Sequence, residues 1–255
     1  MGWLAPCWLD LSCPPMAALI TRPRLLKLSG EALEARDGIL DWHTVERVCG
    51  ELLSGLPRGP IAVVVGGGNI MRGAEMRGSH AGDPTRGDYM GMLATLINSL
   101  ALKEGIERQG SRCEVVGPHL IPNVCHQYNR VQVMAWLAAG VVVVFGGGTG
   151  HPFFTTDTTA ALRAAEIGAA ELLKGSKVDG IYTADPKKVT DAKRFDFLTF
   201  DQAVEGRYAV MDATAFPLCR DHRITIRVFD MTVPGSIAAA LGPNPPGTLV
   251  GDQPR

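Results

Sequence analysis

Short apolar runs alternate along the chain with longer stretches in which hydrophobic residues recur at helical spacing. The runs at 61–65 and 141–145 are apolar at every position, which is typical of strands buried on both faces of a parallel sheet. Strands are predicted at 24–28, 61–65, 113–116, 141–145, 171–174, 224–229 and 248–250. Helices are predicted at 41–54, 88–110, 130–139, 157–168 (capped by Thr156 or Asp157) and 234–241, and from Thr199 and Met211. Single helices between strands imply an α/β fold, a three-layer αβα sandwich around a mainly parallel sheet.

The pattern indicates one domain preceded by a short extension. A length of 255 residues suits one α/β domain, and no internal repeat or low-complexity linker divides the chain. Residues 1–21 are apolar but contain Asp10 and the Pro14–Pro15 pair and lack a basic start, which does not fit a secretory signal. We expect an extension or a mis-assigned start at 1–21 and a single domain at 22–255. Since no apolar run reaches the ~20 residues of a membrane helix, we expect a cytoplasmic protein.

Composition argues against several other classes of protein. The formal net charge is −1 and aromatic residues make up 6% of the chain, so no nucleic-acid surface and no base-stacking platform is expected. The six cysteines form no Cys-x-x-Cys pair, which favours free thiols in a reducing compartment over a zinc site or a disulfide scaffold. The histidines are isolated and are expected to lie in the core or on the surface.

Two glycine clusters each follow a predicted strand. They are Gly66-Gly-Gly-Asn69 and Gly146-Gly-Gly-Thr-Gly-His-Pro-Phe-Phe-Thr-Thr-Asp157. Glycines let backbone N–H groups crowd around an anion, Thr155 and Thr156 add hydroxyl donors, and the Asp157 carboxylate could hold Mg²⁺. Ligands of open α/β sheets bind at the carboxyl ends of strands. The sequence therefore predicts two phosphate sites and two phosphorylated ligands.

Charged residues and a tyrosine near these loops are candidates for ligand contacts, and most of them also allow a structural interpretation. Lys27, at the end of the first strand, fits a charge aimed at a transferring phosphate, or a lysine that reaches solvent from a strand edge. Arg72 could clamp a phosphate with two hydrogen bonds. Asp88 could cap a helix or accept hydrogen bonds from ribose hydroxyls. Lys177 and Tyr182 could face phosphates and stack on a purine, or belong to a polar surface loop. No P-loop motif and no dinucleotide fingerprint occurs in the chain.

Six motifs in order give a resemblance that covers residues 24–250. They are Lys27-Leu-Ser-Gly-Glu-Ala-Leu33, Gly66-Gly-Gly-Asn69, Gly87-Asp-Tyr-Met-Gly-Met-Leu-Ala-Thr95, Thr149-Gly-His-Pro-Phe-Phe-Thr-Thr-Asp157, Lys177-Val-Asp-Gly-Ile-Tyr-Thr-Ala-Asp-Pro186 and Met211-Asp212. Together they closely resemble the bacterial uridylate (UMP) kinases of the amino-acid kinase superfamily. The resemblance implies an amino-acid kinase-like fold and transfer of the γ-phosphoryl group of Mg·ATP to UMP, giving UDP for pyrimidine nucleotide synthesis.

The resemblance also implies residue roles. The catalytic set is Lys27, Arg72, Asp157 and Asp212, with Asp212 orienting Lys27 and Asp157 close to Mg²⁺. ATP is expected at Lys27, Ser29, Gly30, Gly68, Arg72, Ser176, Tyr182 and Asp185. UMP is expected at Gly67, Asp88, Thr149, Gly150, His151, Pro152, Phe153, Phe154, Thr155 and Thr156.

Regulation and assembly follow from the same resemblance. It implies a homohexamer and inhibition by UTP, which can occupy the UMP pocket. His151 stands where many relatives have asparagine, at a position linked to communication between subunits. The loop at 34–38 is shorter than the glycine-rich GTP loop of relatives, which leaves activation by GTP open.

Two rival functions remain. A superfamily member with an amino-acid or carbamate acceptor would share the lysine-glycine start and the Gly-Gly-Gly-Asn loop, but it would lack the Asp-Tyr-Met-Gly-Met-Leu and Pro-Phe-Phe-Thr-Thr-Asp signatures. A non-catalytic nucleotide-binding assembly, like the metal-oxyanion storage proteins of the superfamily, is disfavoured by Lys27, Asp157 and Asp212.

Overall fold

The computed structural model describes residues 21–34, 39–71, 83–186, 188–206, 208, 211–212 and 214–253. Within these residues a single nine-stranded sheet has the order β4-β3-β5-β2-β1-β6-β8-β9-β7. The strands are β1 (Arg24–Leu28), β2 (Ile61–Val65), β3 (Cys113–Gly117), β4 (His126–Gln127), β5 (Val142–Phe145), β6 (Glu171–Ser176), β7 (Phe197–Thr199), β8 (Thr225–Asp230) and β9 (Thr248–Gly251). All neighbouring pairs are parallel except β8 with β9.

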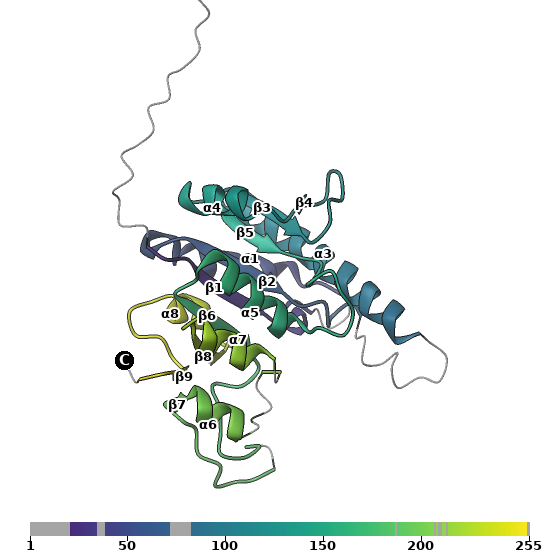
Figure 1. The fold of residues 1–255 in the computed structure, drawn as a ribbon. Helices are drawn as coiled ribbons and strands as arrows, with labels where there is room; N and C mark the ends of the chain where they lie inside the picture. Colours follow the sequence, from purple (N-terminus) through teal and green to yellow (C-terminus); the bar gives the residue numbers. More distant parts are fainter. Residues whose placement is uncertain are drawn as a thin grey trace, which may run out of the picture.

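Helices cover both faces of this sheet (Figure 1). One face carries α4 (Arg130–Ala138), α5 (Thr156–Ile167), α6 (Phe200–Glu205) and α7 (Ala215–Asp221). The other carries α1 (Trp42–Leu53), α3 (Pro84–Arg108) and α8 (Ser236–Ala240), with the 3₁₀ turns η1 (Gly30–Leu33) and η2 (Leu56–Arg58) nearby. The predicted three-layer sandwich with a mainly parallel sheet is confirmed.

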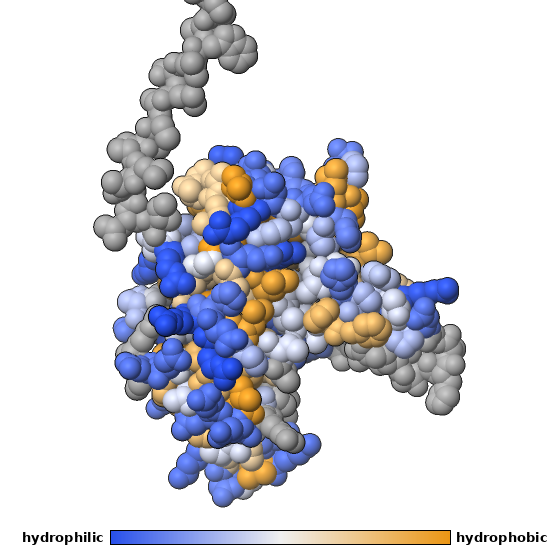
Figure 2. All heavy atoms as spheres, viewed as in Figure 1, coloured by the Kyte–Doolittle hydropathy of each residue, from blue (hydrophilic) through white to orange (hydrophobic). Residues whose placement is uncertain are grey.

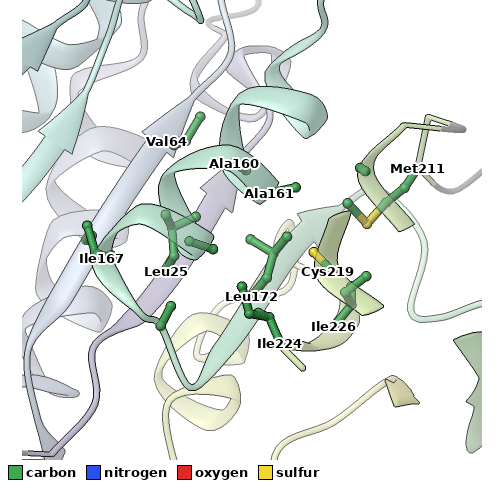
Figure 3. Packing of buried hydrophobic residues seen from close by; sticks show 14 of the residues in the cluster. Leu25, Val64, Ala160, Ala161, Ile167, Leu172, Met211, Cys219, Ile224 and Ile226 are labelled. Carbon is green, nitrogen blue, oxygen red and sulfur yellow. The ribbon is translucent and has the colours of Figure 1, made fainter. Parts of the chain in front are cut away.

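Small side chains bring α5 close to the sheet. Ala160, Ala161 and Ala164 are fully buried and pack in one cluster with Leu25 of β1 and Leu172 of β6 (Figure 3). Alternation along β1 places Leu26 and Leu28 in the cluster on the opposite face. Lys27 therefore points to the same face as Leu25, toward α5.

Helices α3 and α5 begin earlier than the sequence analysis predicts. Helix α3 starts at Pro84 rather than at Asp88, because the Asp83 side chain accepts a hydrogen bond from Thr85 N at 2.9 Å and proline fits the first helical position. Asp88 thus lies one turn inside the helix and does not cap it. Helix α5 is capped by Thr155, whose hydroxyl accepts hydrogen bonds from the N–H groups of Asp157 and Thr158.

Smaller differences occur at the ends of the sheet. Strands β4 and β7 have two and three residues and were not predicted, because so short a segment shows no alternation. The predicted helix from Met211 begins only at Ala215. The expected extension at 1–21 lies, except for Thr21, outside the described residues. None of the helices described is both long and apolar enough to span a bilayer.

The described cysteines are buried free thiols. Cys49, Cys113, Cys125 and Cys219 form no disulfide among themselves, and burial raises the pKa of Cys49, Cys113 and Cys219 to about 12. Because the thiolate is the reactive form, these three side chains carry almost no nucleophile near neutral pH.

We predict that native protein exposed to iodoacetamide at pH 7.5 leaves Cys49, Cys113 and Cys219 unmodified, whereas protein unfolded in guanidinium chloride is modified at all three. Peptide mapping by mass spectrometry resolves each position. Rapid labelling of any of the three in the native protein would contradict the buried placement.

Candidate phosphoryl-transfer site

The two predicted glycine loops meet at one edge of the sheet. They follow β2 and β5, and the ends of β1 and β6 lie beside them because all four strands are parallel neighbours. Gly66 N donates to Leu28 O at 2.9 Å. A Cβ on Gly30 would lie 2.5 Å from Gly66 O, so only glycine lets these two segments approach so closely. The parallel topology therefore joins loops that are far apart in the sequence.

One cavity, of about 210 Å³, lies between α3 and the loop that precedes α5. The predicted UMP residues that line it are Gly67, Asp88, Phe153, Phe154, Thr155 and Thr156. Asp88 Oδ2 accepts a hydrogen bond from Phe153 N at 2.8 Å, and Phe153 has a left-handed φ of 73°. Asp88 thus holds the loop at a strained residue.

The first half of the predicted UMP segment lies apart from this cavity. Thr149, His151 and Pro152 are not among its lining residues, and the Thr149 hydroxyl accepts from His151 N at 3.2 Å within the loop. Gly150 lines a neighbouring apolar cavity of about 190 Å³, between α3 and the residues after β3. Of the predicted UMP segment 149–156, only residues 153–156 therefore line the larger of these two cavities.

A third cavity, of about 290 Å³, opens at the ends of β1 and β6. Of the predicted ATP residues, Lys27, Ser29 and Ser176 line it, together with Lys174 and Glu31, to which the sequence analysis gave no role. Lys177 Nζ lies 2.6 Å from Glu31 Oε2. Ammonium, hydroxyl and backbone groups on one concave surface suit polyphosphate.

The other predicted ATP residues that the structure describes do not line this cavity. Gly68 lies beside Glu31, whose Cγ would be 3.3 Å from a Cβ at that glycine. Gly30 supports the turn described above. Tyr182 donates a hydrogen bond to Asp179 Oδ1 at 2.7 Å, and Asp185 is exposed. Arg72 lies outside the described residues.

Asp157 connects the two lysines at the start of α5. Lys27 Nζ lies 3.0 Å from Asp157 Oδ1, and Lys174 Nζ donates a hydrogen bond to Oδ2. The three side chains are only 11%, 9% and 14% exposed for Lys27, Lys174 and Asp157. Burial lowers the pKa of Lys174, and the Asp157 carboxylate opposes that shift. The site thus holds two ammonium groups against one carboxylate.

Asp212 is held by hydroxyl groups. It accepts hydrogen bonds from Thr155, from Thr158 Oγ1 at 2.6 Å and from Thr214 Oγ1 at 2.8 Å, and also from Ala215 N at 2.9 Å. Burial raises the pKa of Asp212, but the hydrogen bonds from Thr155, Thr158 and Thr214 outweigh it, so the pKa is lowered overall. The expectation from the sequence was that Asp212 orients Lys27. In the structure the carboxylate paired with Lys27 is Asp157.

The side chains fit a metal ion that arrives with a nucleotide. Among the described residues no group of three His, Cys, Asp or Glu side chains could hold a metal by itself. Asp157 Oδ1 is buried and accepts no hydrogen bond of good geometry from the described residues. Mg²⁺ usually takes one or two carboxylates and completes its shell with phosphates and water. Because both Asp157 oxygens face ammonium groups, this carboxylate fits an indirect contact with an ion held by nucleotide phosphates.

Comparisons with known proteins agree with this geometry. Residues 23–230 match the model of the amino acid kinase family. A uridylate kinase of Bradyrhizobium sp. (strain BTAi1) is 49% identical over 237 residues, which cover 92% of this chain and 99% of that protein. The crystal structure of UMP kinase from Bacillus anthracis superimposes with a TM-score of 0.86 at 33% identity, covering 91% of this chain and 97% of that one. UMP kinase from Ureaplasma parvum gives 0.86 at 31%, covering 91% and 99%.

The strand order, the two cavities and the paired lysines are thus found in a chain that matches such relatives over nearly its whole length. The chain belongs to the amino acid kinase family and, within it, to the uridylate kinases.

Proposed function

We propose that this protein transfers the γ-phosphoryl group of ATP to UMP, producing UDP for pyrimidine nucleotide synthesis. One observation carries the proposal: Asp157 directly follows Thr156, which lines the cavity that contains Asp88, and it is ion-paired with Lys27, which lines the cavity that contains Ser29. A donor and an acceptor phosphate placed in these cavities face each other across buried positive charge.

The residue roles follow from the two cavities. ATP phosphates are assigned to Lys27, Ser29, Gly30, Gly68, Arg72 and Ser176, and adenosine to Tyr182 and Asp185. UMP is assigned to Gly67, Asp88 and residues 149–156. Lys27 and Arg72 neutralise the charge that spreads over the transferred phosphoryl oxygens, and Asp157 and Asp212 fix the surrounding groups. No general base is needed, because the UMP phosphate is already an anionic nucleophile.

A divalent ion, which we take to be Mg²⁺, enters with ATP. When bound, it shields the phosphate charges and helps to align them for in-line transfer. Asp157, whose two oxygens face Lys27 and Lys174, would contact it indirectly, through water or the nucleotide phosphates. The chain's own contribution is to position the two phosphates and to exclude water from the space between them.

The assigned acceptor is tested with an ADP-release assay in which Mg·ATP is combined separately with UMP, CMP, dUMP, aspartate, N-acetylglutamate and carbamate. We predict turnover with UMP at least about 100-fold above that with any amino-acid or carbamate acceptor, since the acceptor cavity offers donors for a phosphate. Preference for an amino acid or carbamate would retain the fold and overturn the acceptor. Tight ATP binding without any turnover would favour a non-catalytic protein.

Lys27→Ala removes an ammonium group that acts in the transition state. We predict a fall in kcat of about 100-fold or more, equivalent to ~3 kcal/mol, in steady-state assays with saturating ATP and UMP. Lys193→Ala is the control because its side chain is exposed and lines neither cavity. Near-normal kcat for Lys27→Ala would remove Lys27 from the mechanism.

We also propose that the protein forms a homohexamer in the cytoplasm. Helix α3 exposes an apolar stripe made of Tyr89, Leu93, Ile97 and Leu100, which are 48%, 55%, 49% and 37% exposed. These positions recur at helical spacing on one side of the helix. Figure 2 shows hydrophilic side chains over much of the viewed face, with apolar residues in narrow bands between them. A continuous apolar stripe is therefore best explained by a second copy of the chain packed against it.

Nucleotide regulation is assigned to the same assembly. UTP is proposed to inhibit by occupying the acceptor cavity that UMP uses. GTP is the candidate activator, although residues 35–38 of the relevant loop lie outside the described residues. Helix α3 carries both the apolar stripe and Asp88, which lines the cavity assigned to UMP and bonds to Phe153 N. A movement of α3 at the subunit interface would therefore also move residues 153–156.

The double substitution Leu93→Glu and Ile97→Glu places two carboxylates in the stripe, and we predict that it lowers the assembly state. Sedimentation velocity of the wild-type and variant proteins at equal concentration measures this change. Val204→Glu on α6 is a matched control, because it adds a charge at an exposed valine outside the stripe. An unchanged sedimentation coefficient for the double variant would contradict this interface.

A further inference from the structure

Two lysines occupy directly paired positions on neighbouring strands. In the register of β1 and β6, Lys27 lies opposite Lys174, so both side chains leave the sheet on the face that α5 covers. Lys174 is 7% exposed and lies among the buried residues of the chain, yet it also lines the cavity that contains Lys27 and Ser29. An ammonium group reaches this cavity from β6 as well as from β1.

This arrangement is costly for stability. Like charges directly opposite each other destabilise a sheet, and removing an ammonium group from water costs several kcal/mol. One carboxylate, Asp157, serves both groups, since Lys27 lies at Oδ1 and Lys174 donates to Oδ2. A well-packed apolar residue at position 174 would fit a buried position of this strand equally well, as Leu172 and Leu173 do at the preceding positions. Stability therefore gives no reason for a lysine here.

The charge balance gives such a reason. Lys27 and Asp157 alone would form a neutral pair, and Lys174 places a second positive charge directly at the other oxygen of the same carboxylate, while Asp212 acts on Lys174 without a direct ion pair between them among the described contacts. A neutral pair offers little attraction to a phosphoryl group, and the unpaired Oδ2 would face its oxygens as a like charge. The Lys174 ammonium group therefore neutralises Asp157 at Oδ2 and leaves the charge of Lys27 available to a phosphoryl group.

We propose that Lys174 is a positioning residue for phosphoryl transfer: it holds and neutralises Asp157, so that the positive charge of Lys27 is directed at the transferred group. The inference rests on the proposed function. The sequence pattern of the strand did not indicate a catalytic contribution from Lys174, because this residue acts through Asp157, a carboxylate on α5.

The first experiment compares steady-state kinetics of the full-length wild type, Lys174→Met and Lys193→Met with Mg·ATP and UMP. Methionine keeps the length of the side chain and removes its charge. The expected result is a kcat at least about tenfold lower for Lys174→Met, with the KM values for ATP and UMP within about threefold and the melting temperature not lowered by more than about 4 °C. Lys193→Met keeps wild-type kinetics.

Other outcomes overturn the inference. A kcat less than tenfold lower would show that Lys174 has no such part. A kcat that falls together with higher KM values and a melting temperature lowered by more than about 4 °C would show a structural role only. If Lys174→Met does not fold, Lys174→Gln, which retains polarity without charge, is judged by the same limits.

A double-mutant cycle with Asp157→Asn tests whether Lys174 acts through Asp157. In the Asp157→Asn background, Lys174→Met is expected to change kcat by less than about threefold, because the carboxylate it serves is gone. An unchanged tenfold effect in that background would mean that Lys174 acts independently of Asp157, contrary to the proposal.

The same cycle read by melting temperature needs no turnover. Asp157→Asn is expected to lower it by about 4 °C or more, because two buried ammonium groups lose their counter-ion, and adding Lys174→Met is expected to recover part of the loss. Wild-type protein without activity toward UMP would contradict the proposed function alone. Absence of recovery in the cycle would contradict the Lys174–Asp157 coupling.

Discussion

The arrangement of the site depends on one carboxylate at the start of α5. Asp157 lies between Lys27 of β1 and Lys174 of β6, and these strands are neighbours in the sheet. A buried ammonium group without a counter-ion is strongly unfavourable, so neither lysine could stay at its position if α5 moved away. The position of that helix is therefore coupled to the charge of the site.

The packing that places α5 is simple. The apolar part of its buried face consists of Ala160, Ala161 and Ala164, with Ile167 at the far end, and it packs in one cluster with Leu25 and Leu172 on the two strands that carry the lysines (Figure 3). Alanine lets the helix axis approach the sheet, which short Asp157 needs if it is to reach both ammonium groups. The Thr155 hydroxyl caps the helix and also donates to Asp212. Asp212 in turn accepts from Ala215 N at the start of α7, so the residues that precede α5 are connected to α7.

Local chemistry decided which parts of this arrangement could be predicted. The glycine loops after 61–65 and 141–145 were predicted because glycine and the apolar run before it stand together in the sequence. Lys174 received no role, because a lysine at the end of an apolar strand has no local motif and its partner precedes it by 17 residues. The start of α3 was misplaced at Asp88 although Asp83-Pro84 is itself a start signal, which shows that the acidic residue of a motif need not be the cap.

The misplaced helix start changes the meaning of Asp88. As a cap, its carboxylate would be used by its own helix. One turn inside α3 it is instead available to Phe153 N, and it fixes a left-handed residue in a loop whose aromatic side chains Phe153 and Phe154 are 70% and 54% exposed. Under the proposed function, a pyrimidine ring in this cavity would cover the exposed aromatic surface, so binding energy would be gained where the loop is already held. Asp88, which accepts from the left-handed Phe153, and Asp212, which accepts from Thr155, thus hold residues 153–155 in place without a ligand.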